Sequence, residues 1–185
     1  MRYFLFYKPY AVLSQFSPEP RKQTLKDFLT LPKDIYPVGR LDYDSEGLLL
    51  LTNDNVIKNK LTDPTVGYPK TYCAQVERVP DNAALEKLRK GIIIEGIKTK
   101  PAEIELLSHD PLFPQRSTPI RFRKNVPTAW ITLVLREGRN RQVRKMTAAV
   151  GHPTLRLVRI KIGNIDIGDL SPGQWKEISL QQILL

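Results

Sequence analysis

The chain has 185 residues, of which 41% are apolar, and 29 lysines and arginines stand against 19 acidic residues. This length and composition predict a globular protein with one substantial core, or two small subdomains that share a cleft. The net charge of +10 favours a polyanionic partner such as nucleic acid. One cysteine and two distant histidines give neither an internal disulfide nor a metal-ligand motif. Without a long apolar span or a signal peptide, we expect a cytoplasmic location and no membrane partner.

The first third of the chain reads as short strands and loops that lead into a charged turn. The predicted elements are, in chain order, strands at 3–7 and 11–13, a short helix at 25–29 that Thr24 can cap, and a buried strand at the four leucines 48–51. Residues 39–47, which we call the acidic turn, deliver the chain into that strand between two glycines.

The middle of the chain alternates helical and strand patterns and then becomes irregular. The predicted elements are a helix at 56–61, a strand at 71–79, a helix at 83–90 between Asp81 and Gly91, and a hairpin at 92–99. Residues 109–127 contain four prolines and read as a long basic loop with the cations Arg116, Arg121, Arg123 and Lys124. A loop of this length either wraps a ligand or is a simple surface excursion, and the sequence leaves both open.

The last third contains a clear strand followed by a cationic helix. The predicted elements are a strand at 129–136, a helix from Asn140 as its cap to Val150, a strand at 154–162, a strand at 175–178 and a closing segment at 180–185. Strands outnumber helices, and hairpin-length turns join several of them. We therefore predict an α+β fold with a mixed, mainly antiparallel sheet and flanking helices.

The acidic turn is the first candidate for chemistry. It places Asp42, Asp44 and Glu46 beside an apolar strand, where an ionised carboxylate needs an opposite charge or hydrogen bonds, and Arg40 is close in sequence. The alternative is an exposed loop whose carboxylates only satisfy local backbone groups. The turn alone does not decide between these interpretations.

Several motifs together resemble the RsuA-type family of ribosomal RNA pseudouridine synthases. They occur in the family's order and at compatible separations, and the resemblance covers nearly the whole chain. The motifs are Lys8-Pro9, the turn Gly39-Arg40-Leu41-Asp42 leading into Gly47-Leu48-Leu49, the run Lys70-Thr71-Tyr72, and the stretch from Glu137 to Arg144. The resemblance implies one catalytic domain over 1–185 with a central cleft, or two subdomains around it. We expect no small amino-terminal RNA-binding domain of the S4 kind, since the motifs begin close to residue 1.

The resemblance also implies roles for single residues. Asp42 matches the aspartate that starts cleavage of the uridine glycosidic bond, and Tyr72 matches the tyrosine that stacks on the target base. Arg40 matches the arginine that holds the extruded nucleotide, and Arg144 matches the basic residue that pairs with the aspartate. The implied partner is ribosomal RNA, pointing to the large subunit, with no cofactor and no metal. Whether Asp42 acts as a nucleophile or as a base stays open, and we expect a monomer.

The remaining cations of the helix region are candidates for RNA contact. Arg139, Arg141 and Lys145 share a basic region with Arg144, and we expect them to contact phosphates or solvent rather than to take part in the chemistry. Asp44 and Glu46 are assigned to shaping the acidic turn.

Two other functions remain possible from sequence. A non-catalytic RNA-binding or ribosome-assembly module on the same fold would need only the basic loop and the cationic helix. A carboxylate-dependent nucleoside glycosidase would use paired acids, but it would not need the strong positive charge. The joint presence of Asp42, Tyr72 and Arg144 favours the synthase.

Overall fold

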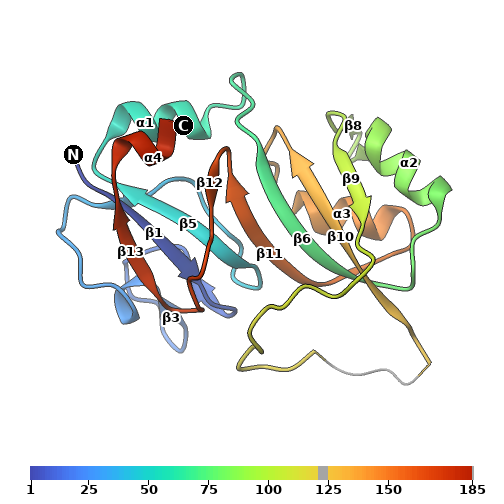
Figure 1. The fold of residues 1–185 in the computed structure, drawn as a ribbon, viewed down its shortest axis with the longest axis horizontal. Helices are drawn as coiled ribbons and strands as arrows, with labels where there is room; N and C mark the ends of the chain where they lie inside the picture. The colour runs from blue at the N-terminus through green and yellow to red at the C-terminus, as the bar shows by residue number, and fades with distance from the viewer. Residues whose placement is uncertain (121–124, 185) are drawn as a thin grey trace.

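The computed structural model describes residues 1–120 and 125–184. Nine strands form one sheet, whose main path follows the order β13-β1-β5-β11-β6-β10-β9 (Figure 1). The strands of this sheet are β1 Tyr3–Lys8, β4 Tyr36–Pro37, β5 Glu46–Thr52, β6 Lys70–Glu77, β9 Glu103–Leu106, β10 Thr128–Leu135, β11 Thr154–Ile162, β12 Ile165–Asp166 and β13 Trp175–Ile178. The helices are α1 Asn55–Thr62, α2 Asn82–Lys90, α3 Gln142–Ala149 and α4 Leu180–Leu184, with a short 3-10 helix η1 at Leu25–Asp27.

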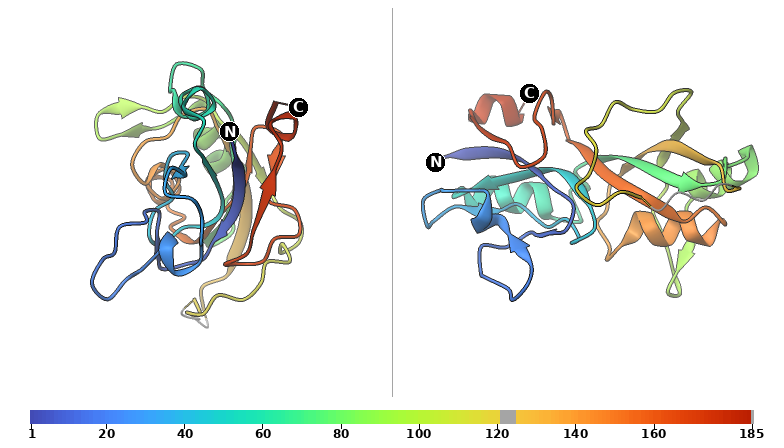
Figure 2. Two further views of the ribbon diagram at one scale, coloured as in Figure 1. Left: turned by 90° about the vertical axis from the view of Figure 1, so that its left-hand side faces the viewer. Right: turned by 90° about the horizontal axis from the view of Figure 1, so that it is seen from below.

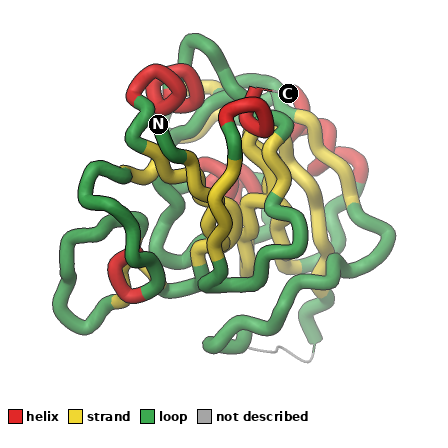
Figure 3. Tube along the Cα trace, turned by 60° about the vertical axis from the view of Figure 1, so that its left-hand side comes forward, coloured by secondary structure: helices red, strands yellow, loops and turns green. Residues whose placement is uncertain are grey.

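The predicted fold class is confirmed. Neighbouring strands of the large sheet are antiparallel except β5 and β11, which pair in parallel at Val158 with Glu46 and Arg159 with Gly47. Two small ladders lie outside it: β2 Val12–Leu13 beside β3 Gln23–Thr24, and the hairpin of β7 Ile93–Ile94 with β8 Ile97–Lys98. Figure 3 shows the strands in the middle of the molecule and long loops around them. No helix among the described residues is long and apolar enough to cross a bilayer.

The four-leucine run is a strand buried on both faces, as the sequence predicts. Leu48 and Leu50 join one hydrophobic cluster, whereas Leu49 and Leu51 join another on the opposite face. The strand β1 alternates in the same way, because successive side chains of a strand point to opposite faces. A third cluster lies in the other half of the sheet, under α2 and α3.

The beginning of α3 differs from the sequence prediction. Arg141, not Asn140, occupies the N-cap position, with a left-handed φ of 51° and no side-chain cap. Its side chain is directed to Asp44 instead, and the side-chain oxygen of Gln142 accepts the N–H of Arg139. A tertiary ion pair has therefore replaced the local cap that the sequence favoured. Thr24 and Asp81 occupy the predicted N-cap positions: the Asp81 side chain accepts the N–H of Ala84, and the Asp27 side chain accepts the N–H of Thr24.

Residues 107–120, which follow β9 and which we call the crossing segment, leave the half of the sheet that contains β9 and β10 and reach the other half (Figure 1). Its Phe113 packs against the cluster on β1 and β5 and lies 5.5 Å from the ring of Trp130 in β10. Because β9 and β10 are neighbours in one half of the sheet, the length of this segment reflects its reach to the other half and not the distance between the strands that it joins. Of the cations predicted here, Arg121, Arg123 and Lys124 lie outside the described residues.

Gly47 lies where β5 and β11 approach most closely. Its φ is +105°, and a Cβ built on it would lie 2.3 Å from the carbonyl oxygen of Arg159. Only glycine fits both the backbone conformation and the contact. The end of the acidic turn is thereby fixed against β11.

We expect Gly47→Ala to lower the free energy of unfolding by about 3 kcal/mol or more, because the new methyl group meets backbone that cannot move aside. Urea denaturation would measure the change. Gly138→Ala is the matched control, since a Cβ added there would have no atom within 4 Å and the φ of Gly138 is not in the left-handed range. Equal midpoints for the two variants would contradict this account of the strand junction.

Candidate active site

Local hydrogen bonds hold the acidic turn in place. The hydroxyl of Ser14 donates to the carbonyl of Leu41 at 2.8 Å and accepts the N–H of Leu41 at 3.1 Å. The N–H of Ser45 donates to the carbonyl of Asp42 at 3.0 Å, which closes the turn. Leu41 and Ser45 are buried, so the turn is anchored on both sides of Asp42.

Glu46 forms a buried ion pair with Arg156 of β11. The two N–H···O contacts measure 2.9 and 2.8 Å, and the side chains are only 2% and 9% exposed. Arg156 also donates to the carbonyl of Pro114 at 2.8 Å. A bidentate pair with this burial is costly to break on one side, by about 3–5 kcal/mol. Glu46 is therefore a structural carboxylate, as the sequence assignment to turn shaping predicts.

Asp44 is held by two arginines of the α3 region. Arg141 donates to both carboxylate oxygens at 2.8 Å, and Arg144 donates to the backbone carbonyl of Asp44 at 2.7 Å. Burial raises the pKa of Asp44, but the hydrogen bonds from Arg141 and the charges of both arginines outweigh it, and the net pKa lies below its ordinary value. Asp44 therefore stays ionised and joins the acidic turn to α3.

Asp42 is the one carboxylate of the turn to which no arginine among the described residues donates a hydrogen bond, so its oxygens are free to contact a ligand. Its contact with Arg141 measures 3.8 Å, beyond hydrogen-bond distance, and its side chain is 33% exposed. No hydrogen bond to its carboxylate is present among residues 1–120 and 125–184. The same turn thus contains two carboxylates used for structure and one that faces solvent close to two guanidinium groups.

Arg144 is placed differently from the sequence expectation. Its Nε lies 3.3 Å from Asp44 Oδ2, and within the described part of the chain its ion pair is with Asp44 rather than with Asp42. Burial lowers the pKa of Arg144, and the charges of Asp44 and Asp42 oppose that effect. The arginine thus lies near both carboxylates but is bonded to the structural one.

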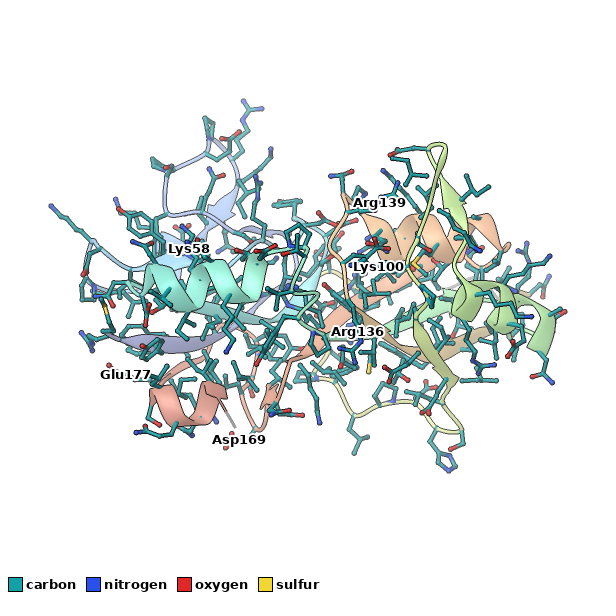
Figure 4. All side chains as sticks on the ribbon, turned by 90° about the horizontal axis from the view of Figure 1, so that it is seen from above. Lys58, Lys100, Arg136, Arg139, Asp169 and Glu177 are labelled. Carbon is teal, nitrogen blue, oxygen red and sulfur yellow. The ribbon has the colours of Figure 1, made fainter. Side chains whose placement is uncertain are left out.

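Of the other predicted site residues, two lie at or near the acidic turn and the β5–β11 junction, and two lie at the β7–β8 hairpin. Near the turn and the junction, Tyr72 is half-buried in β6, directly opposite Arg159 of β11, and Arg40 is exposed at the start of the turn. Arg139 and Lys145 face the β7–β8 hairpin: Arg139 donates to the carbonyls of Ile94 and Ile97, and Lys145 pairs with Glu95 at 2.7 Å. Figure 4 shows Arg139 beside α3 and that hairpin.

The structure adds three buried cations whose role sequence reasoning did not identify. Lys8, Arg156 and Arg159 are at most 7% exposed, and all three surround the β5–β11 junction. Their signal in the sequence is the interruption of apolar strands by a charge, as in Thr154–Ile162. No group of three or more potential metal ligands occurs among the described residues.

Lys8 is fully buried and donates to the carbonyls of Pro9 at 2.8 Å and Val12 at 2.7 Å. Burial lowers the pKa of its ammonium group from 10.5 to about 7, although Glu46, Asp44 and Asp42 act in the opposite direction. Two accepting carbonyls match the two N–H groups of the neutral amine.

The folded protein should therefore become more stable as the pH rises from 7 to 9. In this range the unfolded chain keeps the proton of Lys8 that the folded chain has lost, so Lys8 contributes up to about 1.4 kcal/mol per pH unit. Tyr3 and Tyr7, whose pKa values are raised to about 12, and Cys73, raised to about 11, reverse the trend only at higher pH. Urea denaturation at several pH values would show this slope in the wild type and a smaller slope in Lys8→Met, and equal slopes would refute it.

The chain is similar to known RNA-modifying enzymes over most of its length. Residues 2–149 match the family model described as RNA pseudouridylate synthase. A protein of Vibrio parahaemolyticus called ribosomal large subunit pseudouridine synthase E is 51% identical over 95% of this chain and 73% of the relative. A protein of the same name from Xanthomonas campestris is 51% identical over 93% of this chain and 92% of the relative.

A solved structure has the same fold. The crystal structure of a pseudouridylate synthase superimposes with a TM-score of 0.81 and 28% sequence identity, covering 99% of this chain and 72% of the other. Since the superposition covers 99% of this chain, it includes the sheet and the region of the acidic turn with Arg141 and Arg144. The chain therefore belongs to the RNA pseudouridylate synthase family.

Proposed function

We propose that this protein isomerises one uridine of large-subunit ribosomal RNA to pseudouridine and that Asp42 is its catalytic carboxylate. In this reaction the bond from N1 of uracil to C1′ breaks, the base turns over, and C5 bonds to C1′. C5 loses its proton and N1 regains one, so no external reagent is consumed. One carboxylate that acts on the sugar can serve the whole sequence, either as nucleophile or as base.

The division of labour among the three carboxylates supports this role for Asp42. Arg156 and Arg141 neutralise Glu46 and Asp44 with bidentate contacts, whereas Asp42 keeps an unoccupied carboxylate that is one-third exposed. A paired-acid glycosidase would need a second available carboxylate. In the described part of the chain, the acidic turn has only one carboxylate without a bidentate arginine partner, Asp42.

Tyr72 and Arg40 suit the handling of an extruded nucleotide. An enzyme that acts on a base must take it out of its stack and offset the lost stacking with an aromatic face and cationic contacts. Tyr72 is half-buried beside the β5–β11 junction, and Arg40 is exposed two residues before Asp42. Arg144 contributes by holding Asp44, and hence the turn, in place.

The relatives support the substrate class. Two that are 51% identical to this chain are named as synthases of the large ribosomal subunit, and the charge of +10 suits the binding of RNA. The proposal includes action as a monomer in the cytoplasm. Arg139, Arg141 and Lys145, which hydrogen bonds and ion pairs within the protein hold in place, add positive charge around the bound RNA.

We expect Asp42→Asn to lower turnover by at least about 1,000-fold, because the amide can neither attack the sugar nor remove a proton. Binding of RNA should stay within about fivefold, since a partly exposed charge contributes at most about 1 kcal/mol. Release of tritium from C5-labelled uridine in a large-subunit RNA transcript would measure turnover. Asp169→Asn, an exposed acid in Figure 4, is the matched control.

Pseudouridine mapping in cells that lack the gene would test the substrate. Loss of a large-subunit site that the wild-type gene restores and Asp42→Asn does not would support both parts of the proposal. Full activity of Asp42→Asn would remove Asp42 from the chemistry. Absence of any affected uridine in ribosomal or transfer RNA would favour a non-catalytic RNA-binding module.

Tyr72 should act through its ring. We expect Tyr72→Leu to lower kcat/KM by about 10- to 100-fold, because stacking of a base on an aromatic side chain contributes about 1–3 kcal/mol. Tyr72→Phe keeps the ring and should lose less. The same tritium assay compares the two variants, and equal losses would argue against stacking.

A further inference from the structure

Arg116 is a cation whose position is fixed but whose charge no carboxylate of the described residues neutralises. It lies in the segment between β9 and β10, two residues after Pro114, whose carbonyl accepts from Arg156. Phe113 anchors the same segment against the cluster of β1 and β5, with Arg156 5.6 Å above its ring. The backbone that carries Arg116 is therefore tied to the buried ion pair of the acidic turn.

Two contacts orient the guanidinium group of Arg116. Its carbon lies 4.1 Å from the ring centroid of Tyr10, and its Nε donates to the carbonyl of Thr118 at 2.9 Å. Stacking on an aromatic face and one hydrogen bond together restrict the planar group. The two terminal nitrogens have no hydrogen-bond partner within residues 1–120 and 125–184.

Tyr10 connects this pair to the catalytic turn. The N–H of its neighbour Ala11 donates to the carbonyl of Tyr43 at 2.9 Å, directly between Asp42 and Asp44. Arg116 also lies near Arg144. Burial is the main cause that lowers the pKa of Arg144, and the positive charge of Arg116 is one of the smaller causes that lower it further. Arg116 thus lies beside the acidic turn, on the side formed by β1 and the crossing segment.

Arg40 of the turn is assigned to the extruded nucleotide, and the cations of the α3 region together with Arg156 already have protein partners. Arg141 and Arg144 bind Asp44, Arg156 binds Glu46, and Arg139 and Lys145 bind the β7–β8 hairpin. Arg116 is oriented in the same region, and within the described ranges the four N–H groups of its two terminal nitrogens have no hydrogen-bond partner. A phosphate oxygen pair is the ligand that such a fork accepts.

We propose that Arg116, oriented by stacking on Tyr10, binds a backbone phosphate of the RNA next to the target nucleotide. This inference rests on the proposed function. It makes Arg116 a substrate-binding residue in a segment that the sequence left open as either a ligand wrap or a surface excursion. It also gives Tyr10 a positioning role that is separate from base stacking by Tyr72.

The first test measures the salt dependence of RNA binding in the Asp42→Asn background, with a large-subunit RNA transcript as the probe. Arg116→Ala should weaken binding about 3- to 10-fold and reduce the slope of log K against log salt by about 0.7–1, because one phosphate contact is lost. Arg2→Ala is the matched control, since it also removes one positive charge. Its partner Glu177 lies in the half of the molecule away from α3 (Figure 4).

The second test separates binding from chemistry. With Asp42 intact, Arg116→Ala should raise KM and leave the single-turnover rate at saturating RNA within about twofold, as expected when binding alone is lost. Tyr10→Leu should reproduce part of the KM effect, and Tyr10→Phe, which keeps the ring, should not. Thermal melts confirm that each variant is folded.

An unchanged salt slope for folded Arg116→Ala would overturn the inference, as would a fall in the saturated single-turnover rate without loss of binding. These results differ from failure of the proposed function, in which the wild type forms no pseudouridine on any large-subunit transcript. The binding measurement does not depend on turnover, so the two failures are distinguishable.

Discussion

The parallel pairing of β5 with β11 is the constraint on which the rest of the molecule depends. It joins two antiparallel halves through a short register, in which Glu46 lies opposite Val158 and Gly47 opposite Arg159. The approach is so close that Gly47 admits no side chain. The acidic turn enters β5 at this junction, and Tyr72 of β6 lies across β11 from it. The two halves that carry the acidic turn and Tyr72 are thereby joined by backbone pairing, and Figure 2 (right, from below) shows the two halves side by side.

Charge is distributed around this junction according to burial and to the direction of the Arg141 side chain. The most buried carboxylate, Glu46, has a bidentate arginine partner, and the partly buried Asp44 has another. Asp42, the most exposed of the three, keeps its oxygens available. Asp44 and Asp42 differ little in exposure, and the direction of the Arg141 side chain separates them. Burial accounts for Glu46, because an ionised group deep in the protein must be paired. The same rule accounts for Lys8, whose burial favours the neutral amine.

The residues proposed for RNA binding and for catalysis share parts of the same framework. The segment that carries Arg116 is anchored by Arg156, the partner of Glu46, and Tyr10 adjoins the backbone that binds Tyr43. The cations of α3, in contrast, are largely engaged within the protein. A basic helix therefore need not be the main phosphate-binding surface, because its cations can already be engaged by carboxylates and carbonyls of the protein. For phosphate binding, N–H donors without a protein partner matter more than the number of positive charges.

The sequence by itself determined the longer strands, the helices α1, α2 and α3, and the candidate catalytic turn. Alternation in β1, the leucine run of β5 and the caps at Thr24 and Asp81 depend on local periodicity and short-range hydrogen bonds, which sequence records directly. It missed β9 and the two-residue strands β3, β4 and β12, misplaced the cap of α3 and paired Arg144 with Asp42 instead of Asp44. Only the tertiary structure decided which arginine binds which carboxylate and where the crossing segment places Arg116. Those contacts join residues as far apart as 97 and 110 positions, and nothing in local sequence specifies a partner at such a distance.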